Sequence, residues 1–288
     1  LGSEFAPFFL VEPDQAVEAV KPPEGMGDAR FAKRYEEYKK LLANSPIQQH
    51  GSEYQKESLL KSIDNAHRLL SSPKARKAFD LSLESKESYN TYKVGGRFGL
   101  GCLLAKRLTE AGARFIEVTH GYYPFKYWDT HDNGHTRMKE LKAMIDAPIA
   151  QLVLDLEESN LLDRTLIVVA SEFSRDMMME GKPEKRVKDQ VNVPARIDGL
   201  QHYGMHRHFT GAGSVLLFGG GIKKGFVYGE TADERPCTTI KDPINTQQLH
   251  STIYRALGIP HDHHYNVEQR PFYITPDGIT EPVMDLFG

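Results

Sequence analysis

The segment ARFIEVTHGYYPFKYWDTHDNGH, residues 113–135, decides the fold that we expect for this chain. Its first part, residues 114–119, alternates apolar and polar side chains, which predicts a strand that emerges from a sheet. Regular structure should stop soon afterwards, around Gly121 and Pro124. Five polar side chains gather in this part of the chain: His120, Asp129, His131, Asp132 and His135. Metal sites and acid/base centres are usually built on a loop held by a rigid strand, so we expect the active end of the protein here.

A helix is expected on each side of this segment. Residues 97–112, RFGLGCLLAKRLTEAG, place leucines on one stripe and stop at a glycine that suits a C-terminal cap. Residues 137–159 repeat the helical spacing, and Pro148 should kink that helix. The nearly continuous apolar run TLIVVAS, residues 165–171, is typical of a strand buried on both faces of a parallel sheet. Strand, helix and strand in this order predict a right-handed βαβ unit.

The two ends of the chain complete the expected architecture. Residues 31–43 and 57–70 have amphipathic helical spacing and are dense in Lys and Glu. We therefore expect residues 1–93 to be an irregular segment followed by a helical arm or lobe. Residues 94–288 should form an α/β body, because the run SVLLFGGG at residues 214–221 predicts another buried strand. The expected fold class is α/β, with a mostly parallel central sheet flanked by helices.

Composition limits the partners of the protein. The chain has 288 residues, 40% hydrophobic content and a formal net charge of -3, so it can bury a substantial core without a broad basic face. Its two cysteines, Cys102 and Cys237, are far apart in sequence and predict no disulfide framework. No apolar run approaches the roughly 18 residues of a membrane span. We expect no nucleic-acid partner and no membrane span.

Candidate ligands follow the expected strands. Asp129 and His131 are two residues apart, so in an extended segment both side chains point the same way, which suits two ligands on one ion. Glu172 stands immediately beyond the carboxyl end of the apolar run at 165–171, where open α/β sheets place their ligands. A long polar segment then carries three histidines back toward the sheet: His202, His206 and His208. The sequence therefore predicts a site made of carboxylates and imidazoles.

Five blocks of sequence occur in a specific order from about Ala75 onward. They are GGRFGLGCLLAKRLTEAGARFIEV, WDTHDN, LLDRTLIVVASEFSR, SVLLFGGGIKKG and LHSTIYRALGI. They resemble successive blocks of the bacterial family known as domain of unknown function 1501, which is similar to the alkaline phosphatase and sulfatase superfamily. The resemblance implies an alkaline-phosphatase-like fold with one or two divalent metals at the carboxyl ends of a parallel sheet. It also implies a metal-dependent hydrolase of phosphate or sulfate esters, acting on a small-molecule or polysaccharide ester.

The resemblance implies metal-binding roles for four residues. Asp129 and His131 resemble the Asp/His pair supplied by the loop after a central strand. Glu172 stands where the superfamily usually shows an Asp, and His208 takes the place of a late metal-binding His. Phe173 stands where a His or Asn is usual, so the second of two possible metal positions is impaired. The four residues would form a four-ligand site, or a three-ligand site with one open position.

The chemistry of these donors suggests which ions they would bind. Oxygen and imidazole ligands suit Zn²⁺, Mn²⁺ or Fe²⁺ better than Ca²⁺. Zn²⁺ and Mn²⁺ are therefore candidate ions, and we keep Ca²⁺ as a third candidate. Neighbouring polar residues are expected to orient the ligands or to bind an anion. These residues are His120, His135, His206, Arg175 and Lys126.

The superfamily's first acidic ligand and its Ser, Thr or formylglycine nucleophile lie on an N-terminal portion that has no counterpart here. By resemblance, we expect this chain to be the C-terminal part of the fold, with the catalytic nucleophile outside it. The sequence begins at Leu1 rather than Met, so we expect a processed chain or a fragment. Family members are often exported, which implies a periplasmic or extracytoplasmic location.

Structural alternatives remain open for every candidate. Asp129 and His131 would then be a turn residue and an exposed histidine. Glu172 would pair with Arg175, and His208 would be a surface side chain. Two other functions also remain open. One is a non-catalytic exported binding protein that keeps the fold without the reaction centre, and the other is a fragment that is inert alone.

Overall fold

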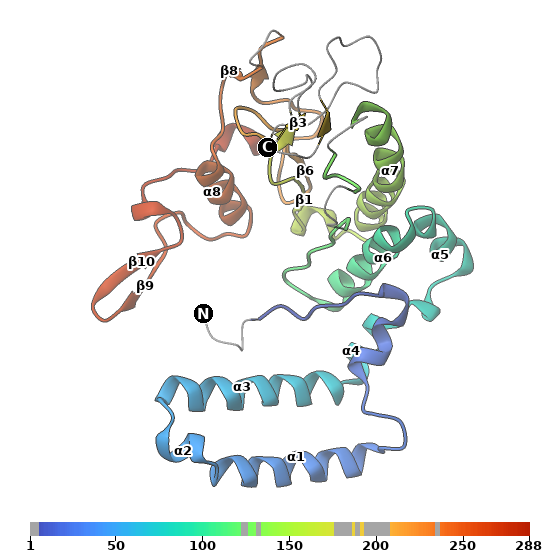
Figure 1. Cartoon of the computed structure of the whole chain (residues 1–288), viewed down its shortest axis with the longest axis vertical. Helices are drawn as coiled ribbons and strands as arrows, with labels where there is room; N and C mark the ends of the chain where they lie inside the picture. The colour runs from blue at the N-terminus through green and yellow to red at the C-terminus, as the bar shows by residue number, and fades with distance from the viewer. Residues whose placement is uncertain are drawn as a thin grey trace. The chain divides into compact units, whose positions relative to one another are not determined.

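The computed structural model describes residues 6–121, 126–130, 134–175, 186–187, 191–192, 208–233 and 237–288. The chain divides into two compact units, Leu1–Thr119 and His120–Gly288. Figure 1 colours the first unit from blue to teal and the second from green to red. The boundary expected from the sequence, between residues 93 and 94, lies inside the first unit and remains a prediction.

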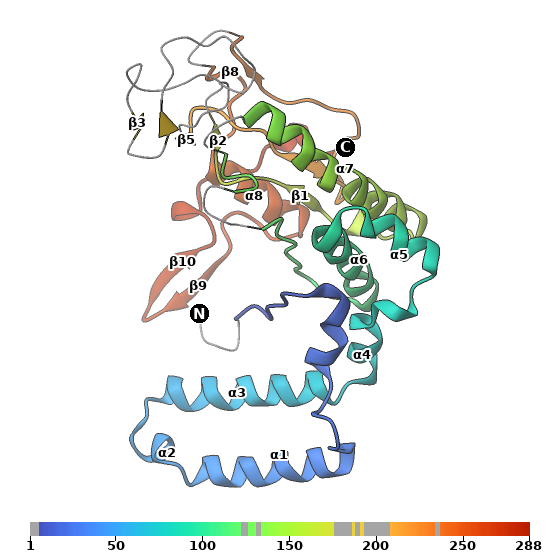
Figure 2. The same cartoon turned by 45° about the vertical axis from the view of Figure 1, so that its right-hand side comes forward.

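Two long helices form an arm in the first unit. They are α1 (Asp28–Ala43) and α3 (Glu53–Leu70), connected through the short α2 (Pro46–His50), and they run antiparallel in both views (Figures 1 and 2). The imidazole of His67 on α3 stacks on the ring of Tyr35 on α1, with centroids 3.7 Å apart. A hydrogen bond from Tyr35 to Asp64 raises the pKa of this phenol to about 12. The two amphipathic helices expected from the sequence are confirmed.

The rest of the first unit packs around α6 (Gly96–Ala111). Its other elements are η2 (Pro13–Val20), α4 (Pro73–Phe79), η3 (Leu81–Leu83) and α5 (Lys86–Lys93). The buried apolar side chains of this core include Val20, Leu81, Tyr92 and Leu103. The helix ends at Gly112, whose φ of 95° lies in the left-handed region, so the expected glycine cap is confirmed.

A charged cluster lies at the edge of this core. Arg107 and Lys106 on α6 both bind the carboxylate of Glu84, Lys106 at 3.2 Å. Burial would raise the pKa of Glu84, but the hydrogen bond from Arg107 and the charge of Lys106 outweigh it and hold the pKa below its ordinary value. These contacts join α6 to the segment between η3 and α5.

The segment after α6 does not form the expected strand. In the described part of the chain, residues 114–119 pair with no strand. The side chain of Phe115 is 85% exposed, whereas Ile116 and Val118 are half-buried. Val118 packs on α6, because one of its methyl groups lies 2.8 Å from where a Cβ would be at Gly101. Alternating side chains indicate a strand only where a neighbouring strand supplies hydrogen bonds, so this prediction was wrong.

The described part of the second unit contains two α-helices. They are α7 (Gly134–Glu158), which contains the fully buried Pro148, and α8 (Thr246–Ala256). The side chains of Asn245 and Gln248 form a capping box at the start of α8. Within the described ranges, none of the helices combines the length and the apolar character that crossing a membrane requires.

The strands of the second unit form antiparallel pairs. The pairs are β1 (Ile167–Val169) with β6 (Leu216–Phe218), β2 (Ser174–Arg175) with β5 (His208–Phe209), β3 (Arg186–Val187) with β4 (Val191–Asn192), β7 (Glu230–Thr231) with β8 (Thr239–Lys241), and β9 (His264–Val267) with β10 (Arg270–Tyr273). Each is a two-stranded sheet, and the described residues form no central parallel sheet. The expected α/β fold class, with an alkaline-phosphatase-like sheet flanked by helices, was therefore wrong. The described chain is mostly helical.

The physical reason lies in the direction of β1 and β6. Both apolar runs do form strands, but Ile167 pairs with Phe218 and Val169 with Leu216, so the strands run in opposite directions. The predicted burial of both strands was also wrong, because β1 is half-buried and Leu216 of β6 is 55% exposed. An apolar run carries no information on the direction of a neighbouring strand. Parallel pairing would require a crossover that returns the chain to the same end of the sheet. The βαβ prediction fails because its first strand, residues 114–119, does not form in the described chain.

The chain leaves β6 through a tight glycine turn. Gly219 has a φ of 71°, and a Cβ at this position would lie 2.3 Å from the carbonyl oxygen of Leu162. The N–H of Gly220 donates to the same carbonyl oxygen at 3.0 Å. The close approach fixes the end of the strand against η4 (Leu162–Arg164).

Candidate functional site

The pairing of β2 with β5 brings His208 beside the segment that follows β1 (Figure 2). The register places Arg175 opposite His208 and Ser174 opposite Phe209. The imidazole of His208 stacks on the ring of Phe173, with centroids 4.0 Å apart and ring planes inclined by 24°. Candidate residues that are far apart in sequence therefore lie on neighbouring strands.

Phe173 is the residue that contacts His208. Glu172 precedes it directly, and both Glu172 and His208 are exposed. Side chains alternate between the faces of a strand, so a metal ligand at position 173 would lie beside the imidazole of His208. The aromatic ring of Phe173 occupies that position instead. The pairing places His208, in β5, near the chain segment of Glu172, two residues before β2, and the residue that contacts the imidazole is apolar.

A second group of candidate residues surrounds the single tryptophan of the chain. Trp128 donates a hydrogen bond from its indole N–H to Nδ1 of His120 at 2.7 Å. Tyr127 approaches the same imidazole edge to face, with centroids 5.9 Å apart. Burial lowers the pKa of His120 below its ordinary value. This imidazole is therefore held between aromatic rings in its neutral form.

The hydrogen bond determines what His120 can do. A neutral imidazole has one acceptor nitrogen and one N–H, and Trp128 uses the acceptor at Nδ1. The proton then resides on Nε2, which makes that nitrogen a donor rather than a metal ligand. This geometry suits the orienting or anion-binding role expected for His120, which remains a prediction.

Asp129 lies in a tight turn. Its backbone N–H donates to the carbonyl oxygen of Lys126 at 3.1 Å, and its side chain is half-buried. Tyr127, within this turn, has a φ of 51°, which a non-glycine residue rarely adopts. Thr130 follows and is almost fully buried. The turn agrees with the alternative that Asp129 is a turn residue. It also fixes the backbone that would hold Asp129 as a metal ligand.

Several candidate residues lie outside the described part of the chain. His131 and His206 are among them, and so are the side chains of His135 and Arg175. In the described ranges, no group of three His, Cys, Asp or Glu residues is placed to hold a metal ion. Asp129, Glu172 and His208 therefore do not make a complete metal site by themselves. A full set of ligands would require His131 or another residue outside these ranges.

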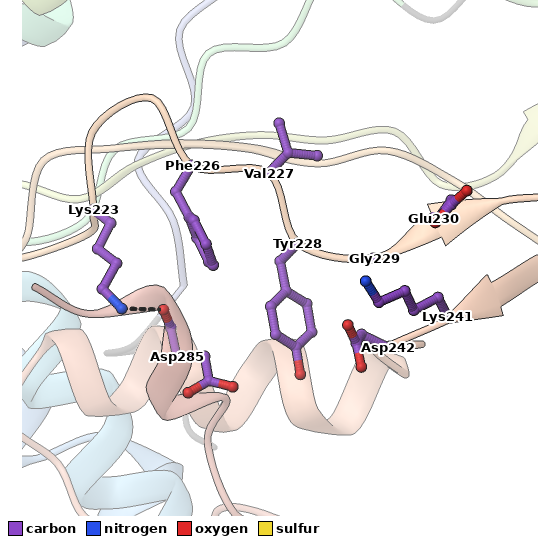
Figure 3. Close-up of a pocket in the computed structure, with 9 residues that line it drawn as sticks. All are labelled: Lys223, Phe226, Val227, Tyr228, Gly229, Glu230, Lys241, Asp242 and Asp285. Carbon is purple, nitrogen blue, oxygen red and sulfur yellow. Dashed lines mark hydrogen bonds between the residues drawn. The ribbon is translucent and has the colours of Figure 1, made fainter.

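A cavity of about 590 Å³ lies elsewhere in the second unit, and no residue that lines it was among the predicted site residues (Figure 3). Its lining residues are Lys223, Phe226, Val227, Tyr228, Gly229, Glu230, Lys241, Asp242 and Asp285. The sequence pattern that could have indicated this cavity is the alternation of side chains around position 227. It directs two aromatic side chains to the same side of an extended segment.

The described fold and site define a mostly helical protein whose candidate ligands lie at the pair of β2 with β5 and on an aromatic turn. The family described as "protein of unknown function (DUF1501)" matches residues 1–286, and the chain belongs to this family. The match includes the N-terminal helical arm, which precedes the five sequence blocks that carry the resemblance. No curated protein and no solved structure matches the chain, so these comparisons give no support to a likeness with alkaline phosphatases or sulfatases.

Proposed function

We propose that the protein is a metal-dependent hydrolase of phosphate or sulfate esters. The observation that carries this proposal is the pairing of β2 with β5, which brings His208 from a distant part of the sequence opposite Arg175, three residues after Glu172. A carboxylate and an imidazole are donors that Zn²⁺ and Mn²⁺ accept. The ester class comes from the resemblance of the sequence blocks, and a parallel sheet is not part of the proposal.

Each residue has a specific role in this proposal. Asp129 and His131 would supply two ligands, and Glu172 and His208 would supply two more. The bound metal would polarise the ester oxygen and activate the attacking group. His120, whose pKa is lowered by burial, would orient a ligand or bind an anion. The nucleophile is not assigned to any residue of this chain.

Metal content tests the proposal directly. We expect the purified chain to hold about one divalent ion, measured by inductively coupled plasma mass spectrometry. The double change Asp129→Ala with His131→Ala should remove it. The chain contains a matched control with the same spacing, Asp262→Ala with His264→Ala, in and beside β9. Full metal retention in the first double variant would contradict the proposal.

A second candidate function is a non-catalytic exported binding protein that has lost the reaction centre. The stacking of Phe173 on His208 favours it, because an apolar ring stands where a ligand would be expected. Hydrolysis of p-nitrophenyl phosphate and p-nitrophenyl sulfate, with and without EDTA, separates the two functions. Turnover that EDTA abolishes supports the hydrolase. The absence of turnover in metal-loaded protein supports the binding protein.

A further inference from the structure

We propose that the cavity in Figure 3 is a binding site for a neutral saccharide. Its volume of about 590 Å³ lies within the range of small-ligand sites, roughly 300–1,000 Å³. The site does not include Asp129, Glu172 or His208. The inference therefore does not depend on the proposed metal chemistry.

Two aromatic side chains form the apolar part of the cavity. Phe226 and Tyr228 project to one side of their segment, whereas Val227 projects to the other (Figure 3). The ring centroids are 6.3 Å apart and the ring planes are inclined by 52°. Phe226 is 46% exposed, and no hydrogen bond within the described chain occupies the Tyr228 hydroxyl. Exposed aromatic surface with a polar tip suits the C–H face and the hydroxyls of a pyranose ring.

Free polar groups surround these rings. The carboxylates of Glu230 and Asp242 and the ammonium of Lys241 have no hydrogen bond or ion pair with other described residues. Carboxylates accept hydrogen bonds and an ammonium group donates them, so together they can satisfy sugar hydroxyls, which do both. Figure 3 shows the Asp242 carboxylate beside Tyr228 and the Asp285 carboxylate on the opposite side of that ring.

The backbone around the cavity is held by several hydrogen bonds. Lys223 donates from Nζ to the carbonyl oxygen of Asp285 at 2.9 Å and from its backbone N–H to Leu286 at 2.8 Å. Residue Ile222 forms a β-bridge with Phe287. On the other side, β7 and β8 pair Glu230 with Lys241. The lining is therefore assembled before a ligand arrives, which reduces the entropy cost of binding.

The charges favour a neutral ligand. The cavity has three carboxylates, from Glu230, Asp242 and Asp285, and two ammonium groups, from Lys223 and Lys241. Lys223 already lies over the ring of Phe226, 5.2 Å from its centroid, and binds a backbone carbonyl. A sulfated or carboxylated sugar would meet unpaired like charge. A sugar without ionised groups meets donors and acceptors only.

Saturation-transfer difference NMR of the intact chain tests this inference. The neutral probes are cellohexaose, maltohexaose and xylohexaose, and the anionic probe is a chondroitin sulfate hexasaccharide. We expect binding of at least one neutral probe, and no comparable signal from the anionic probe. Binding should persist in EDTA, so a failure of the metal-site proposal would leave this result unchanged. The absence of binding by all three neutral probes would overturn the inference.

Variants assign the binding to this cavity. Phe226→Ala and Tyr228→Ala should each weaken the affinity about tenfold, because each removes one aromatic face. Tyr228→Phe keeps the ring and should stay within about threefold of the original affinity. Tyr265→Ala is the control, because Tyr265 is exposed on β9 and does not line the cavity. Unchanged affinity in both alanine variants, with folding verified by circular dichroism, would place the ligand elsewhere and overturn the inference.

Discussion

The ring of Phe173 stacks on the imidazole of His208 with centroids 4.0 Å apart, across the pairing of β2 with β5. A nitrogen ligand at position 173 would form a pair of metal ligands with His208, but the side chain at this position is apolar. The contact also shows that position 173 is within reach of this imidazole.

Phe173→His is the first prediction. An imidazole at position 173 would lie beside His208 and add a nitrogen ligand, so we expect Zn²⁺ to bind at least about tenfold more tightly. Phe173→Leu is the control, because it removes the stacked ring without adding a ligand. Isothermal titration with Zn²⁺ compares the variants. Equal affinities in the His and Leu variants would show that position 173 does not face a metal site.

The second prediction concerns Trp128 and His120. The indole N–H stabilises the neutral imidazole by donating to Nδ1, so Trp128→Phe should raise the pKa of His120 from its lowered value. NMR titration of the His120 ring protons measures this shift. A pKa that stays unchanged in Trp128→Phe would mean that the hydrogen bond does not hold the neutral form.

The third prediction is the effect of pH on stability through His120. Its pKa in the folded protein is below the ordinary value of 6.5, so the unfolded chain takes up a proton first as the pH falls. The free energy of unfolding should therefore decrease as the pH falls below about 6.5, and this loss should stop below the folded pKa. Chemical denaturation at several pH values measures it. His120→Phe should remove this part of the pH dependence, and an identical pH dependence in that variant would contradict the prediction.

The fourth prediction concerns the charged cluster at Glu84. Glu84→Ala leaves Arg107 and Lys106 without their half-buried carboxylate, so we expect a loss of about 2 kcal/mol in the free energy of unfolding. Glu37→Ala on α1 is the control, because its pair with Lys40 is exposed and should contribute little. Denaturant titration followed by circular dichroism compares the two variants. Equal effects would mean that burial does not strengthen the Glu84 pairs.

Local signals were sufficient to predict the helices. The spacing of apolar residues and the glycine at position 112 predicted α6 and its end. The spacing in residues 31–43 and 57–70 predicted α1 and α3. Such signals lie within one helix turn of the residues that they affect, so the sequence contains them in full.

Strand pairing could not be predicted in the same way. The runs at 165–171 and 214–221 did become β1 and β6, but whether they pair in parallel depends on the path of the chain between them. The segment at 114–119 has the alternation of a strand and no described partner. Pairing connects distant residues, and a single sequence records only each strand's own pattern.

The candidate site was predicted in part. The prediction named Glu172 and His208 separately, and the structure pairs the strand that contains His208 with the strand that begins two residues after Glu172. The hydrogen bond between Trp128 and His120 was missed, because it depends on how the turn at Tyr127 folds back rather than on a regular spacing. A site composed of loop residues is defined by backbone turns that periodicity does not encode.

The central claim is that Glu172, which precedes β2, and His208, in β5, supply a carboxylate and an imidazole to one metal ion. Isothermal titration of Zn²⁺ and Mn²⁺ into the unmodified chain and into the double variant Glu172→Ala with His208→Ala tests it most directly. We predict at least about a hundredfold weaker binding in the double variant, because two of four ligands are lost. Equal affinity of the two proteins for both ions would contradict the claim.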